Sequence, residues 1–154
     1  SLVYNGRFPI DRFVIGVSFG EAAKGFYFAS SANQGIVNET VGEFPVALFA
    51  DAETRVVHVF ISSPRAGLSG AQDLPEVLTF HAVEAAIELE DSTVQDIETG
   101  STWDIEAGVA TDGSLKGALL QRAPFISSYY WAWEDFNPHT EFWPNNEGRF
   151  DELE

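Results

Sequence analysis

Arg55-Val-Val-His-Val-Phe-Ile61 is the most apolar strand-like segment of the chain, and it decides the fold class. Its β-branched and aromatic residues favour a strand. A run with so little polar alternation is typical of a strand that is covered on both faces. Phe44-Pro-Val-Ala-Leu-Phe-Ala50 precedes it and predicts another strand, with Pro45 near the start, where a missing N–H is tolerated. The polar residues 51–54 predict a turn, so we expect 55–61 to be a central strand.

Outward from this segment, strand and turn signals recur at short intervals. Residues 12–18 and 24–29 predict a hairpin around a turn at 20–21, and residues 62–76 predict a long loop. Further strands are expected at 35–42, 77–83, 85–90, 93–96, 102–110 and 117–122. Many short strands with close turns predict a mainly β fold, a sandwich or barrel-like antiparallel domain.

One short helix is expected near the C-terminus, at residues 127–136. Tyr129, Trp133 and Phe136 fall on one face at helical spacing. The following Asn137-Pro138 would end the helix, because the residue before a proline avoids helical geometry.

The length and composition predict a single domain over residues 1–154, with a loose acidic tail from about residue 144. The apolar share is 45% and the aromatic share 14%, which is enough for a packed core. No apolar run approaches the roughly 20 residues that cross a bilayer.

Charge is the strongest compositional signal: 24 Asp and Glu face 8 Lys and Arg, for a net charge of −16. Such self-repulsion opposes a compact state at low ionic strength. At molar salt the Debye length is only about 3 Å, so most of the repulsion is screened. We therefore expect a protein of a salt-adapted organism. The same charge argues against binding to nucleic acid or to an anionic membrane surface.

The chain contains no Cys and no Met, which excludes disulfides, thiolate nucleophiles, zinc–thiolate sites and iron–sulfur clusters. No nucleophile elbow and no phosphate-binding glycine loop occurs. The three histidines, His58, His81 and His139, show no metal-ligand spacing. We expect no catalytic residue, no metal and no cofactor.

Four segments, in order, carry a resemblance to a known family. They are Val14–Val17 with Ala23–Phe26; Ile36–Gly42 running into Pro45-Val46; Asp96–Trp103 followed by Gly108 and Gly113–Leu120; and Tyr129–Glu141. Together they resemble the bacterial and archaeal family catalogued as domain of unknown function 3179. The resemblance implies a mostly β domain, often on secreted or lipid-anchored proteins, and no established reaction.

The chain departs from that family at two places. Many members carry cysteine after the Pro-Val strand, where this chain has Leu48-Phe-Ala-Asp-Ala-Glu53. Many carry a His before the Val-Asn motif, where this chain has Gln34. Any thiol or metal chemistry that relatives perform with those residues is absent from this branch.

Two polar segments offer candidate sites, each with a structural alternative. Asn38 and Glu39 present oxygens that suit a ligand or a hard cation, or they hydrogen-bond the backbone at a strand end. Asp96 through Trp103 forms a pocket edge, or a tight turn with a positive φ at Gly100 and Trp103 in the core.

Aromatic residues are unusually dense near the C-terminus, and one helix face buries only part of them. The cluster comprises Tyr129, Tyr130, Trp131, Trp133, Phe136, Phe142 and Trp143. Tyr and Trp favour interfaces. We expect Tyr130, Trp131 and Trp143 to contact a partner, with Trp131 or Trp143 exposed in the isolated chain.

The leading hypothesis is a non-enzymatic binding or structural module, outside the cell or at its surface, that contacts a partner protein or assembles with itself. The cytoplasm of an organism that accumulates salt is the alternative location. A first alternative function is an enzyme or cation-binding protein that uses a His and carboxylates such as Glu134 and Glu141. A second is an electron-transfer subunit with non-covalent haem on His58 or His81.

The charge hypothesis predicts a strong dependence of stability on salt. The midpoint of thermal unfolding, followed by circular dichroism, should rise by ten degrees or more, as an order-of-magnitude figure, between dilute buffer and molar KCl. Equal midpoints in the two solutions would remove the hypothesis.

Overall fold

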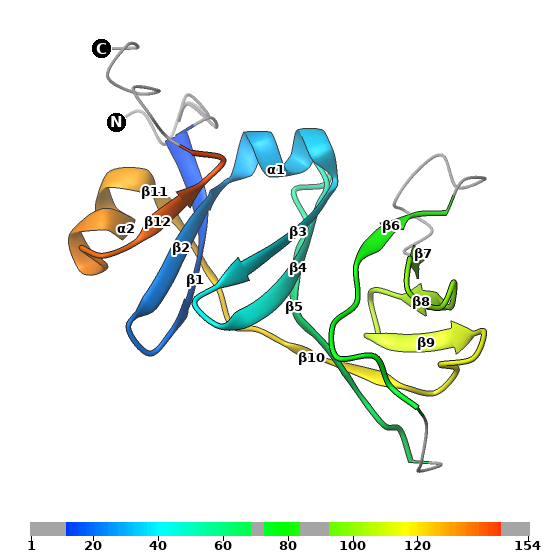
Figure 1. Cartoon of the computed structure of the whole chain (residues 1–154). Coiled ribbons are helices and arrows are strands. Elements are labelled where there is room, and N and C mark those ends of the chain that lie inside the picture. The colour runs from blue at the N-terminus through cyan, green and yellow to red at the C-terminus, as the bar shows by residue number, and fades with distance from the viewer. Residues whose placement is uncertain (1–11, 69–72, 84–92, 146–154) are drawn as a thin grey trace.

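The computed structural model describes residues 12–68, 73–83 and 93–145 and confirms a mainly β fold (Figure 1). One group of strands comprises β1 (Phe13–Phe19), β2 (Ala22–Tyr27), β11 (Ile126–Tyr129) and β12 (Glu141–Trp143). A second comprises β3 (Ile36–Val41), β4 (Phe44–Ala50), β5 (Val57–Arg65), β6 (Phe80–Ala82), β7 (Thr93–Asp96), β8 (Thr102–Asp104), β9 (Val109–Asp112) and β10 (Leu119–Arg122). The helices in these ranges are α1 (Phe28–Gln34) and α2 (Tyr130–Phe136).

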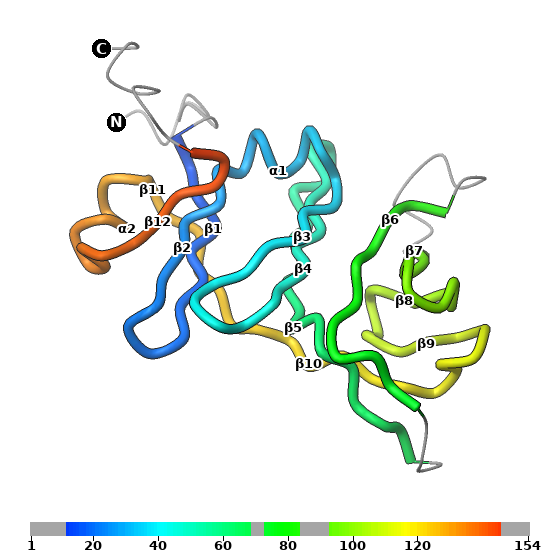
Figure 2. The backbone as a smooth tube through the Cα atoms, viewed as in Figure 1, coloured from blue at the N-terminus to red at the C-terminus, as the bar shows by residue number. Residues whose placement is uncertain are grey.

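The first group forms a sheet in the order β11-β1-β2-β12. β1 and β2 are an antiparallel hairpin with β11 antiparallel to β1, whereas β12 runs parallel to β2. The backbone trace in Figure 2 shows this lobe, with α2, on the opposite side of β3–β5 from β6–β9.

The second group forms an antiparallel sheet in the order β3-β4-β5-β10-β9-β8-β7-β6. β5 lies between β4 and β10, so the expectation of a central strand is confirmed. The two end strands meet through one side chain. Asn38 Nδ2 of β3 donates to the Phe80 carbonyl of β6 at 3.0 Å, and the Phe80 N–H donates to Asn38 Oδ1 at 2.9 Å. The sheet is therefore almost a closed barrel.

Two apolar clusters hold these layers together. The barrel-like sheet encloses rings in edge-to-face contact, with Phe49–Phe80 and Phe80–Trp103 centroids each 5.8 Å apart. The other cluster lies between the sheets, where Ile15 and Phe26 pack with residues such as Leu48. Burial of each such side chain contributes about 1.5–3 kcal/mol.

Helix α1 was not expected, because residues 24–29 carry a strand pattern and Ser and Asn are mediocre helix formers. β2 ends at Tyr27, and Phe28 turns into the inter-sheet cluster as the first residue of α1. The helix ends at Gly35, whose φ of 85° lets its N–H reach the Ser31 carbonyl at 2.7 Å. Packing has overridden local propensity here.

Other boundaries also differ from the expectations. The single strand expected at 102–110 is wrong: the Asp104 side chain accepts the Glu106 N–H at 2.9 Å, and the chain turns at Gly108 with φ 71°. The loop expected at 62–76 begins later, because β5 continues to Arg65.

The strand expected at 77–83 is reduced to β6. The strand expected at 85–90 and most of the expected acidic tail lie outside the described residues. The helix expected at 127–136 begins only at Tyr130, because β11 is hydrogen-bonded to β1.

A pair of glycines allows α2 to pack closely on the first sheet. Gly16 and Gly25 face each other across β1 and β2, and the indole of Trp133 lies over both. A Cβ at Gly16 would fall 2.4 Å from ring atoms of Trp133, and a Cβ at Gly25 would fall 3.0 Å from them. The indole N–H donates to Thr140 Oγ1 at 2.7 Å, which ties the turn after α2 to the same ring.

Gly16→Ala should therefore destabilise the protein, because the new methyl group displaces the indole of Trp133. We expect a loss of about 1–3 kcal/mol in the free energy of unfolding, as for other overpacked sites. Denaturant unfolding in KCl, followed by tryptophan fluorescence, measures it. Ser18→Ala, at an exposed position of the same strand, is the control and should change stability by less than about 0.5 kcal/mol. Equal effects of the two substitutions would contradict the conclusion that Gly16 leaves the space in which the Trp133 indole packs.

Candidate functional site

Helix α2 presents two aromatic side chains to solvent. Trp133 is the buried residue of this seven-residue helix, whereas Trp131 is 54% exposed and Phe136 is 85% exposed. The three residues expected on one helix face are not buried together: Tyr129 precedes the helix, and Trp133 is buried whereas Phe136 is exposed. The helix touches the sheet through Trp133 and ends at Phe136, where Asn137 N–H turns back to the Trp133 carbonyl at 2.9 Å.

Two more apolar side chains are exposed where β11 begins. Phe125 is 37% exposed and Ile126 is 54% exposed. We call Phe125, Ile126, Trp131 and Phe136 the β11–α2 surface. Sequence reasoning missed the first two because they lie next to a Ser-Ser pair and outside the aromatic cluster. The pairing of β11 with β1, which places Ile126 opposite Gly16, joins segments far apart in the chain and left no signal in the local sequence.

Trp131 stacks on the ring of Tyr129, which in turn stacks on Phe13. The Tyr129 ring lies 5.7 Å from the Trp131 ring at an interplanar angle of 13°. On its other side Tyr129 lies 4.6 Å from Phe13 at 15°. Offset stacking of this kind fixes ring orientation at a small energetic gain. Trp131 is therefore held in place while half of its surface faces solvent.

The other two expected aromatic contacts are less available. Tyr130 is half-buried against the cluster that contains Trp133. Trp143 packs against the inter-sheet cluster, with its ring 6.2 Å from Phe26. The structure thus brings Trp131 to the surface and uses Tyr130 and Trp143 largely for packing.

Asn38 and Glu39 both make contacts that hold the fold. Asn38 joins β3 to β6, as described above. Glu39 Oε1 lies 3.2 Å from the Nζ of Lys24, which is only 8% exposed and lies 3.6 Å from Glu141. Both residues line an open hollow of about 290 Å³ with Ser62 and others, but they do not lie on the strand or helix that carries Trp131.

The three histidines lie on separate segments. His58 is on β5, with its ring stacked 6.3 Å from Phe60 and its Nδ1 3.2 Å from the Arg122 guanidinium. Burial, and next the positive charge of Arg122, lower the pKa of His58. A neutral ring then accepts the hydrogen bond from Arg122. No group of three His, Cys, Asp or Glu among the described residues is arranged to hold a metal ion.

The segment from Asp96 to Trp103 forms the tight turn that was one of the two alternatives expected for it. Gly100 has a φ of 72°, and Trp103 is fully buried. The buried Asp96 carboxylate accepts from the Trp103 indole N–H at 2.8 Å and from the Gly100 N–H at 3.1 Å. It also accepts from Thr99 Oγ1 at 2.8 Å. These donors satisfy a charge that burial would otherwise make costly.

Comparison with known proteins adds one decisive observation. The family profile described as "Protein of unknown function (DUF3179)" matches residues 3–140. The chain belongs to this family. No curated protein and no solved structure matches the DUF3179 chain. The match carries the family but no activity.

The structure explains several segments by which this DUF3179 chain resembles its family. Gly16 and Gly25 leave the space in which the Trp133 indole packs. Asp96 and Trp103 form the buried turn. Both are contacts that hold the fold. None of the helices that the structure describes is long and apolar enough to span a membrane.

Asn38→Ala should weaken the fold, because it leaves the Phe80 N–H and carbonyl without their partner. We expect a loss of about 1 kcal/mol in the free energy of unfolding, measured by denaturant titration. Thr40→Ala, at an exposed position of the same strand, is the matched control and should be nearly neutral. A neutral Asn38→Ala would show that the β3–β6 contact does not hold the barrel-like sheet closed.

Proposed function

We propose that this DUF3179 chain is a non-enzymatic binding module that docks a partner protein on its β11–α2 surface. The observation that carries the proposal is the exposure of Trp131 and Phe136, at 54% and 85%, on a helix anchored by Trp133. Large rigid aromatic side chains at interface centres contribute much of the binding energy. A ring held by stacking also loses little conformational entropy when it binds.

The charges beside this surface favour a particular partner. Glu134 and Asp135 are exposed on the same helix. A partner with an apolar centre and a basic rim would complement them. A second copy of this chain would instead bring like charges together, in a molecule whose net charge is −16. The charge pattern therefore favours a different protein over self-assembly.

The enzyme alternative gains no support from the geometry of its two carboxylates. Glu141 lies 3.6 Å from the Lys24 ammonium, within the contact between β12 and β2. Glu134 is exposed on α2. The proposal places the module outside the cell or at its surface in a salt-adapted organism, with a salt-rich cytoplasm as the other setting. The support is the acidic composition together with the family resemblance.

The test uses a synthetic peptide of alternating Leu and Lys as a probe for an apolar partner with basic charges. Binding is followed by fluorescence anisotropy of the labelled peptide in 1 M KCl, where screening at about 3 Å suppresses non-specific attraction. The double variant Trp131→Ala with Phe136→Ala should bind about tenfold more weakly than the wild type. Ile97 is 63% exposed in the turn after β7, so Ile97→Ala is the control and should bind like the wild type.

Equal affinity of the double variant and the Ile97→Ala control would refute the docking surface. Sedimentation velocity of the peptide-free chain provides a second check. A concentration-dependent dimer that the double variant abolishes would replace the partner with a second copy of this chain.

A further inference from the structure

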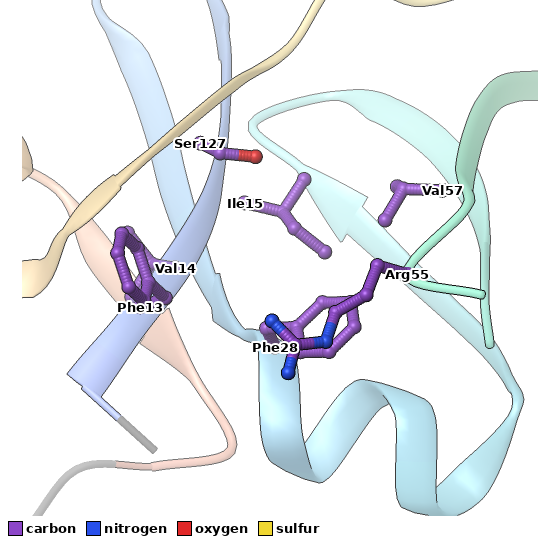
Figure 3. A pocket seen from close by; sticks show the side chains of 7 residues that line it. All are labelled: Phe13, Val14, Ile15, Phe28, Arg55, Val57 and Ser127. Carbon is purple, nitrogen blue, oxygen red and sulfur yellow. The ribbon is translucent and has the colours of Figure 1, made fainter. Parts of the chain in front are cut away.

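A cavity of about 190 Å³ lies between the two sheets, near one end of α1 (Figure 3). Its residues come from β1, α1, β5 with the turn before it, and β11. The apolar lining residues are Phe13, Val14, Ile15, Phe28 and Val57. The polar lining residues, Arg55 and Ser127, are both exposed, so they mark the side that faces solvent.

The side chains of some cations among the described residues have polar partners, whereas those of Arg55 and Arg65 do not. Lys24 pairs with Glu39, and Arg122 contacts His58 and the Glu106 carbonyl. Within the described residues, the Arg55 guanidinium makes no hydrogen bond or ion pair. The part of the chain that the structure describes thus places this charge beside an apolar cavity with no carboxylate paired to it.

The backbone holds Arg55 in a conformation that L side chains rarely adopt. Its φ is 65°, in the left-handed region where glycine is the usual residue. The turn that imposes this φ is well bonded: the Arg55 N–H donates to the Asp51 carbonyl at 2.8 Å, and Asp51 Oδ1 accepts the N–H of Glu53 at 2.7 Å. A strained, well-held residue at the edge of a cavity is a common feature of ligand sites.

We propose that this cavity binds a small carboxylate with an apolar body, such as a single aromatic ring or a short branched chain. An apolar cavity of about 150 Å³ takes up benzene, so a volume near this one suits one ring and little more. The apolar body packs among Phe13, Ile15 and Phe28. The carboxylate lies toward Arg55, which donates paired hydrogen bonds to planar anions, and the Ser127 hydroxyl offers a further donor.

This inference goes beyond the docking of a partner and rests on different residues. The two sites are nevertheless connected by one stack of aromatic rings. Phe13 lines the cavity and also stacks on Tyr129, which stacks on Trp131 of the β11–α2 surface. Variants of Arg55 leave that stack intact, so failure of one proposal is distinguishable from failure of the other.

The experiment titrates phenylacetate into the ¹⁵N-labelled chain at the lowest KCl concentration at which it is fully folded. We expect saturable amide shifts confined to residues around the cavity, with a Kd on the order of 1 mM. Acetate lacks the apolar body and 2-phenylethanol lacks the charge, so both should bind at least about tenfold more weakly.

Arg55→Gln should weaken phenylacetate binding about tenfold and leave 2-phenylethanol unaffected. Arg65→Gln removes an exposed positive charge at the far end of β5 and should behave like the wild type. Absence of saturable shifts in the wild type, equal weakening by both substitutions, or shifts confined to α2 would each overturn the proposal. An unchanged unfolding midpoint of Arg55→Gln would show that lost binding is not lost folding.

Discussion

The indole of Trp133 against the Gly16–Gly25 pair is the contact on which the rest of the surface depends. Two residues without side chains, opposite each other in a hairpin, leave room for one flat ring. That ring fixes the rotation of α2, and the rotation turns Trp131 and Phe136 outward. Its N–H also holds Thr140, one residue before β12 begins. One aromatic contact thus orients both the exposed side chains of α2 and the start of β12.

Two polar contacts join further strands of the fold. Lys24 links three strands, since it extends from β2 to Glu39 of β3 and to Glu141 of β12. Asn38, beside Glu39, closes the barrel-like sheet at Phe80. Contacts of this kind contribute modest stability, and the buried ammonium of Lys24 adds geometric specificity because a buried polar group tolerates few alternative partners. They explain why so acidic a chain keeps a lysine in its interior.

The fold class was predictable from the sequence because strand signals are local. The run 55–61 is β-branched and apolar enough to identify a central strand, and β3, β4 and β7 closely follow their expected ranges. Helix α1 was not predictable from its own residues. It forms because Phe28 packs between the sheets, which is a contact with distant segments. The break after Asp104 depends on a side-chain turn that resembles ordinary strand sequence.

The candidate sites were only partly predictable for the same reason. Aromatic density alone predicted that Trp131 or Trp143 would be exposed, and the structure exposes Trp131. The packing site of Trp133 depends on the register of β1 and β2, which places Gly16 opposite Gly25. The cavity beside Arg55 is formed by residues from four segments. Asn38 and Glu39 attracted attention as oxygen donors, yet their partners lie 42 and 15 residues away in the chain. Spacing along a sequence does not reveal such pairs.

The order of strands in the first sheet also has a consequence for biosynthesis. Its inner hairpin, β1 and β2, leaves the ribosome early, whereas both flanking strands, β11 and β12, come from residues 126–143. Until those residues emerge, the nascent hairpin has two open edges whose backbone groups can pair with any neighbouring strand. Productive folding of this lobe therefore waits until residues 126–143 have emerged, and a chain truncated before β11 would expose an aggregation-prone hairpin.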